Sequence, residues 1–177
     1  MSDAAQFVRR RLADDLTGCV RALRAVHTAD GYPTWWPVDP TGWLTPPGLV
    51  DAWVAERAGV VVGHLCVVRS VPDPLVASHA GVPTDRLAEV SRLFVAPEAR
   101  GQDLGAALLA TASSWAAAHS LQLMLDVVDD SGPAPALYER LGWLLVDRRP
   151  AAWTTPTGLR PSIRIYRAPT AGASRPS

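Results

Sequence analysis

The stretch of this chain best suited to chemistry runs from Leu93 to Leu109, with the sequence Leu-Phe-Val-Ala-Pro-Glu-Ala-Arg-Gly-Gln-Asp-Leu-Gly-Ala-Ala-Leu-Leu. An apolar strand ends at Pro97, a turn of small residues follows, and a helix begins. Such a corner directs several backbone N–H groups toward one point, with the positive end of the helix dipole behind them. Gly101 and Gly105 allow an anion to approach the main chain. The segment therefore predicts a pyrophosphate site, although an ordinary strand–turn–helix corner explains the same pattern.

Two better-known phosphate motifs are not found at this turn. A dinucleotide-binding fold would show Gly-x-Gly-x-x-Gly, and a P-loop would show glycine followed by lysine and serine or threonine. The segment matches neither pattern. The turn is therefore neither of these two phosphate-binding motifs.

The elements that must position this turn follow from hydrophobic periodicity. Leu16, Val20, Leu23 and Val26 share one helical face, and Gly31 with Pro33 stops that helix. Further helices are expected over 101–120 and 133–141, and a proline-containing connection over 70–86. Strands are expected over 5–12, 52–56, 60–69, 87–95, 121–128, 143–149 and 162–167. Helices and strands mixed in this way predict an α/β protein.

Residues 31–50 differ from the rest because prolines and aromatic rings crowd together there. Prolines at this density forbid a long helix or a central strand. We expect a long ordered loop with at most one short helical turn, since loops of this length are functional or disordered and the rings argue against disorder.

Two segments together resemble the GNAT superfamily of N-acetyltransferases. Arg100–Gly105 is similar to motif A, whose core is Arg/Gln-x-x-Gly-x-Gly/Ala, and Ala136–Trp143 is similar to motif B, typically Ala-Leu-Tyr-Glu-x-x-Gly-Phe. The resemblance is good over residues 87–147. It implies a central mixed, mostly antiparallel sheet flanked by helices and splayed at the cofactor site. We expect one N-acetyltransferase domain over 1–168 and a disordered tail over 169–177.

The resemblance implies acetyl-CoA as co-substrate and no metal. Asp103 departs from the pattern because it replaces the central glycine of motif A, and Ser131 stands where many members carry asparagine. The residues expected to bind the coenzyme are Leu93, Phe94, Val95, Arg100, Gly101, Gln102, Asp103, Leu104, Gly105, Ala106, Ser131 and Tyr138.

Acetyl transfer to an amine needs a base, because an alkyl ammonium group has a pKa near ~10.4. Glu89 and Asp126 are the two candidates; Asp126 lies in the apolar run 121–128, where burial would raise its pKa. By resemblance, the Val95 N–H polarises the thioester carbonyl and Tyr138 protonates the leaving sulfur. The alternatives are a surface charge for Glu89, a strand-end hydrogen-bonding partner for Asp126 and a packed ring for Tyr138.

The sequence says little about the identity of the amine that accepts the acetyl group. An aromatic, acidic pocket for a cation is one interpretation of residues 30–43, and anchoring of the loop by its rings is the other. The first interpretation uses the rings of Tyr32, Trp35, Trp36 and Trp43 with the carboxylates of Asp30 and Asp39.

Composition excludes several classes of partner. The 17 basic residues, all arginine, balance 17 acidic ones, so no overall field would attract nucleic acid or a membrane surface. Because it contains no lysine, the chain cannot acetylate lysines of its own. The isolated Cys19 and Cys66 and the scattered histidines show no metal-ligand spacing. Without a signal-like or membrane-spanning stretch, we expect a soluble, cytoplasmic protein.

The sequence thus predicts an enzyme that transfers the acetyl group of acetyl-CoA to the primary amine of a small molecule by direct attack. Acetylation of protein N-termini and a non-catalytic acyl-CoA-binding module are the alternatives, the latter because of Asp103. The resemblance also allows a homodimer.

Overall fold

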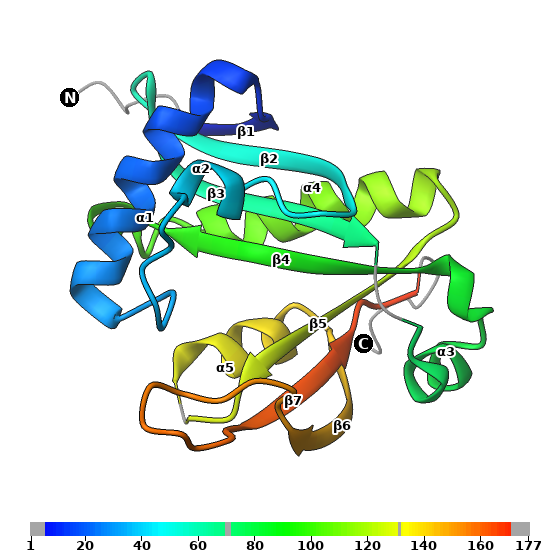
Figure 1. Cartoon of the computed structure of the whole chain (residues 1–177). Coiled ribbons are helices and arrows are strands. Elements are labelled where there is room, and N and C mark those ends of the chain that lie inside the picture. Colours follow the sequence, from blue (N-terminus) through cyan, green and yellow to red (C-terminus); the bar gives the residue numbers. More distant parts are fainter. Residues whose placement is uncertain (1–5, 70–71, 131, 171–177) are drawn as a thin grey trace. The chain divides into compact units, whose positions relative to one another are not determined.

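The computed structural model describes residues 6–69, 72–130 and 132–170 (Figure 1). The strands are β1 (Gln6–Arg10), β2 (Leu49–Arg57), β3 (Val60–Arg69), β4 (Leu87–Val95), β5 (Gln122–Val128), β6 (Leu144–Pro150) and β7 (Ser162–Arg167). The α-helices are α1 (Leu16–Asp30), α2 (Pro40–Trp43), α3 (Pro74–Ala80), α4 (Leu104–Ala118) and α5 (Pro133–Arg140). Short 3-10 turns occupy η1 (Ala13–Asp15), η2 (Thr84–Arg86) and η3 (Pro97–Ala99).

The strands form one sheet in the order β1-β2-β3-β4-β5-β7-β6. β4 and β5 are parallel, whereas β1–β2, β2–β3, β5–β7 and β6–β7 are antiparallel. The last strand, β7, therefore lies between β5 and β6. This mixed, mostly antiparallel sheet with flanking helices confirms the predicted fold class.

The chain divides into two compact units, and the first comprises residues 1–69 and 90–112. Within it, β2 is buried continuously over 52–55 and β3 over 61–67. Burial without alternation means that both faces of these strands are covered. α1 and the first half of α4 supply buried apolar side chains to this unit: Cys19, Leu23, Val26, Leu104 and Leu108.

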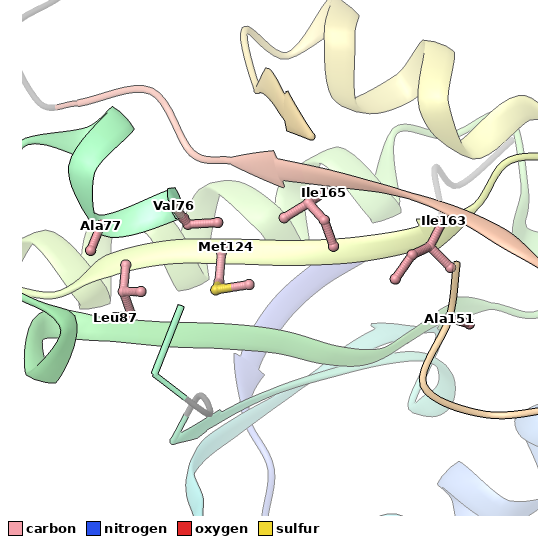
Figure 2. Packing of buried hydrophobic residues seen from close by; sticks show 7 residues of the cluster. All are labelled: Val76, Ala77, Leu87, Met124, Ala151, Ile163 and Ile165. Atoms are coloured by element: carbon pink, nitrogen blue, oxygen red, sulfur yellow. The ribbon is translucent and has the colours of Figure 1, made fainter. Parts of the chain in front are cut away.

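The second unit comprises residues 70–89 and 113–177 and has its own apolar cluster. Figure 2 shows the cluster, in which α3, the start of β4, β5 and β7 contribute side chains. Its members are Val76, Ala77, Leu87, Met124, Ala151, Ile163 and Ile165. The prediction of a single domain over 1–168 stays a prediction, and most of the predicted tail lies outside the described residues.

Most predicted elements are confirmed, and β4 and β7 have the predicted bounds. The connection over 70–86 contains α3, which we did not predict. Its start is nonetheless encoded locally, because Asp73 Oδ1 accepts hydrogen bonds from the N–H groups of Leu75 and Val76 and Pro74 occupies the first helical position. No described helix is long and apolar enough to cross a membrane.

Candidate functional site

The turn before α4 has an unusual backbone. Gly101 has φ +73° and Asp103 has φ +55°, so two left-handed residues precede the helix, which begins at Leu104 rather than at 101. The first helical bond runs from Ala107 N–H to Asp103 O at 2.9 Å. Helix geometry leaves the N–H groups of the first turn without intrahelical acceptors. A Cβ at Gly101 would meet nothing within 4 Å, so the main chain is open on that side. The turn thus combines a helix start with an open main chain, and binding of a diphosphate there stays a prediction.

Asp103 adopts a left-handed backbone conformation, which glycine adopts freely. Left-handed backbone costs most residues about 1–2 kcal/mol, and aspartate tolerates it better than most.

The Arg100 side chain points back to the rest of its unit. Its Nε donates to Val95 O at 3.2 Å, and its Nη groups form an ion pair with Asp30 at the end of α1. This pair is substantially exposed, so it stabilises the fold by at most about 1 kcal/mol. The guanidinium is engaged within the unit, and the main-chain N–H of Arg100 donates to Pro97 O at 3.3 Å.

β4 is irregular immediately before Leu93–Val95, the segment that we predict to bind the coenzyme. Arg92 has φ +55°, and its carbonyl accepts a hydrogen bond from His64 Nδ1 at 2.9 Å. The neighbouring Ser91 carbonyl accepts from the thiol of Cys66 at 3.3 Å. Side chains of β3 therefore satisfy two carbonyl groups of the distorted strand. The sequence carries no local signal for this arrangement.

His64 is fully buried and neutral. Burial, with a smaller contribution from the nearby charges of Arg11 and Arg92, lowers its pKa to about 4. Since Nδ1 faces a carbonyl, it carries the proton, and Nε2 accepts from Arg11 Nη1 at 3.0 Å. Arg11 also donates to Leu44 O at 2.6 Å and to Thr45 Oγ1 at 3.2 Å. One hydrogen-bonded chain thus connects the proline-rich segment to β4.

The aromatic rings of the proline-rich segment fall into two groups. Trp36 lies against His27 and under Arg24, and Trp43 packs edge-on to Tyr32. Trp35 is 62% exposed and Tyr32 is 37% exposed. The inner rings therefore anchor the segment, as one interpretation holds, while Tyr32 and Trp35 offer surface to a ligand.

Asp30 and Asp39, the two carboxylates predicted to line an acidic pocket, each bind another group of the protein. Asp30 pairs with Arg100, and Asp39 caps α2 by accepting from Gly42 N–H at 2.9 Å. The binding role of this segment stays a prediction.

Both candidate bases lie on one face of the sheet in the second unit. Glu89 pairs with Met124 in the parallel β4–β5 ladder, so the two side chains point the same way. Asp126 follows Met124 by two residues and shares that face. Glu89 is half-buried.

The expected burial of Asp126 is wrong, because its side chain is exposed. β5 is buried over Gln122–Leu125 and then emerges. The paired positions of β4 and β5 in the described chain end at Met124, and the burial of β5 ends one residue later, at Leu125.

Tyr138 is buried on α5, where its ring lies 5.8 Å from that of Tyr166. Tyr166 pairs with Leu125, so Tyr138 packs on the sheet face opposite to Asp126. Burial, followed by the negative charge of Asp126, raises the pKa of Tyr138 to about 12. Its hydroxyl is therefore protonated and able to donate at neutral pH.

The other predicted coenzyme residues lie around the turn. Phe94 and Leu104 are buried, and Leu93, Val95, Gln102, Gly105 and Ala106 are half-buried. Ser131 lies outside the described residues. No group of three or more metal-ligating side chains occurs within 6–69, 72–130 and 132–170.

The sequence matches a family model described as the acetyltransferase (GNAT) family over residues 11–143. No curated protein matches it significantly. The ribosomal-protein-S18-alanine N-acetyltransferase of Escherichia coli has a similar structure, with TM-score 0.69 and 18% identity over 98% of this chain and 100% of that one. Arabidopsis thaliana NAA60, solved with acetyl-CoA, has TM-score 0.72 and 16% identity over 92% and 97%. A structure described as a phosphinothricin N-acetyltransferase has TM-score 0.69 and 20% identity over 94% and 99%.

Proposed function

This chain belongs to the acetyltransferase (GNAT) family and is an acyltransferase; on that premise we propose that it acetylates the primary amine of a small molecule. The observation that carries the proposal is the left-handed turn at Gly101 and Asp103, which leads into the N-terminus of α4. Such a turn offers main-chain N–H groups and the positive end of a helix dipole to a diphosphate.

Acetyl-CoA would supply an acetyl group activated as a thioester. The main chain of 100–106 would hold its diphosphate, and Leu93–Val95 would pair with its pantetheine amides. The open space beside Gly101 and the chain's own partners for the Arg100 side chain are consistent with a contact made by backbone rather than by side chains.

Proton movement is assigned to three side chains of the second unit. Glu89 or Asp126 removes the proton from the acceptor ammonium, so that the neutral amine can form the new C–N bond. The Val95 N–H donates to the carbonyl oxygen as negative charge develops there. As the C–S bond breaks, Tyr138 donates its proton to the sulfur, and the second proton lost by the acceptor nitrogen passes through solvent and restores the Tyr138 hydroxyl. The carboxylates are on the sheet face opposite to the one on which Tyr138 packs, so the group that removes a proton and the group that delivers one are separate.

The exposed rings of Tyr32 and Trp35 support a small acceptor with an apolar body. They belong to a segment whose backbone is fixed by Arg11 and whose inner rings are packed. Among similar structures, one is described as acting on the small molecule phosphinothricin and another on a ribosomal protein. An experiment must therefore distinguish small amines from protein N-termini as the acceptor.

The test measures thiol release from acetyl-CoA with a panel of small primary amines and a panel of peptides with free N-termini. We expect release with small amines and little with peptides. A preference for peptides would contradict the small-molecule assignment and favour N-terminal acetylation. In parallel, calorimetry should detect binding of coenzyme A; absence of binding would refute the role of the turn.

A cytoplasmic location and a homodimer stay predictions. Both cysteines are buried, and burial raises the pKa of the Cys19 thiol to about 12, which supports a structural role in reduced form.

A further inference from the structure

The two inner tryptophans of the proline-rich segment, Trp36 and Trp43, each have an arginine side chain of the protein over one ring face. The Arg92 guanidinium lies over Trp43 at 4.4 Å from the ring centroid, and that of Arg24 lies over Trp36 at 4.3 Å. A ring face covered by an arginine is not open to the ammonium group of a ligand. These two rings therefore do not form a cage for a cationic acceptor.

Two guanidinium groups in this region, those of Arg11 and Arg92, form no ion pair among the described residues, although the charge of Arg11 contributes to lowering the pKa of Asp15. No ion pair of the described residues involves Arg11 or Arg92, and the positive charges of both act on His64. Asp30 and Asp39, the acids of the segment, are held by Arg100 and by the start of α2. The guanidinium charge of Arg92 is therefore not neutralised by an ion pair among the described residues.

The Arg92 side chain is braced in one orientation. Its Nε donates to Trp43 O at 3.3 Å, its Nη1 donates to Ser91 Oγ at 2.8 Å, and its flat group is stacked on Trp43. These two bonds leave other N–H donors of the guanidinium unused. A stacked and braced arginine loses little freedom when its remaining donors bind a carboxylate.

Arg92 also stands at a distinctive place in the chain. Its left-handed backbone interrupts β4 immediately before Leu93–Val95, the segment assigned to the coenzyme. A backbone outlier next to a reactive segment is a reason to consider a functional role. Its ring partner, Trp43, contacts Tyr32, one of the two rings with exposed surface.

We propose that Arg92 binds a carboxylate of the acceptor, so that the substrate class is amines bearing a carboxylate on an apolar or aromatic body. Tyr32 and Trp35 would contact that body. This inference rests on the proposed function and makes its substrate class specific. The competing explanation is that Arg92 has a structural role alone: its contacts with Trp43 hold that residue against β4, and it binds no substrate.

The experiment compares acceptors that differ in charge alone. Pairs such as 4-(aminomethyl)benzoate and 4-(aminomethyl)benzamide, and homologues with longer spacers, are assayed for kcat/KM by thiol release. We expect the wild-type enzyme to prefer the carboxylate by at least about tenfold, the size of one charge-assisted hydrogen bond. Arg92→Gln should lower kcat/KM for the carboxylate to the level of the amide and leave the amide within about threefold. Arg92→Lys, which retains the charge without the planar fork, should keep part of the preference.

Arg21→Gln is the matched control, because it removes one exposed positive charge from α1 of the same unit. It should retain the full preference. Thermal unfolding and calorimetry with acetyl-CoA show whether each Arg92 variant is folded and binds the coenzyme. If Arg92→Gln does not fold, Arg92→Lys alone decides whether the preference for the carboxylate acceptor depends on the planar set of guanidinium N–H donors.

Three results overturn the inference: no preference for the carboxylate in the wild type, an equal loss for both acceptors in a folded Arg92 variant, or a preference that survives both variants. Turnover without charge preference would leave the proposed function intact. Absence of turnover with every amine, despite coenzyme binding, would refute both.

Discussion

Acidification should destabilise this protein through one buried side chain, His64. Its ring is fully buried between Arg11 and the Arg92 carbonyl, and its pKa is about 4 in the folded state against 6.5 for an unperturbed histidine. The unfolded chain therefore binds a proton at a pH where the folded chain does not. Stability from this residue is complete above pH 6.5 and is lost as pH falls toward 4.

The magnitude follows from the difference in pKa. The 2.5-unit difference between 6.5 and about 4 corresponds to about 3 kcal/mol when fully expressed, at 1.36 kcal/mol per unit. Between pH 7 and pH 5 the linkage relation gives a loss of about 2 kcal/mol. With a urea m-value of about 2 kcal/mol per M, this is a shift of about 1 M in the midpoint.

Other groups also change protonation between pH 7 and pH 5. The stability of the variant His64→Asn at both pH values therefore serves as the reference for the effect of His64 alone. Asparagine places an amide nitrogen near the position of Nδ1 and can still donate to the Arg92 carbonyl, but it does not titrate. At pH 7 the wild type should be more stable by about 1–3 kcal/mol, since the Nε2 acceptor and part of the buried ring are lost. At pH 5 most of that advantage should have disappeared.

Urea unfolding followed by circular dichroism at both pH values measures the two differences. His119→Asn, a change at an exposed histidine, controls for the loss of a histidine as such. A gap between wild type and His64→Asn that stays constant from pH 7 to pH 5 would refute the assignment of a buried, neutral His64. A histidine ring signal of His64 that titrates above pH 6 by NMR would refute it independently.

Three further predictions concern the coenzyme turn and proton transfer. Asp103→Gly should raise stability by up to about 1 kcal/mol and leave coenzyme A binding equal or tighter, because glycine adopts φ +55° freely and the carboxylate is removed; clearly weaker binding by calorimetry would contradict this. Tyr138→Phe should lower kcat by about 10–100-fold without abolishing activity, since a thiol of pKa ~8.5 leaves tolerably unaided; an unchanged kcat in a thiol-release assay would assign Tyr138 to packing. Glu89→Gln should lower kcat/KM more than Asp126→Asn with coenzyme binding unchanged in both, because Glu89 is half-buried and reaches one methylene further; the reverse order would make Asp126 the base.

Much of the fold can be predicted from local pattern. Period-two and period-3.6 patterns describe contacts of a residue with its near neighbours along the chain, and these suffice for β4, β7 and the helix that starts at Leu16. The start of α4 was predicted three residues early, because periodicity does not report that Gly101 and Asp103 adopt left-handed backbone. α3 was missed although its Asp73-Pro74 start is a local signal.

In the candidate site, too, features set by consecutive residues could be predicted, and features set by contacts between distant segments could not. The turn at 100–106 could be predicted because glycine positions and a helix start are properties of consecutive residues. The exposure of Asp126 could not, since its apolar neighbours along the strand do not report how far β4 pairs beside it.

By itself, then, the sequence determined most of the order of elements, the glycine-containing turn before α4 and the family, because each depends on residues close together in the chain. Only the tertiary structure decided that β7 lies between β5 and β6 and that His64 supports the carbonyl of Arg92. The stacking of Arg92 on Trp43 joins residues 49 positions apart. Such contacts form when distant segments pack together, and no spacing within either segment specifies them.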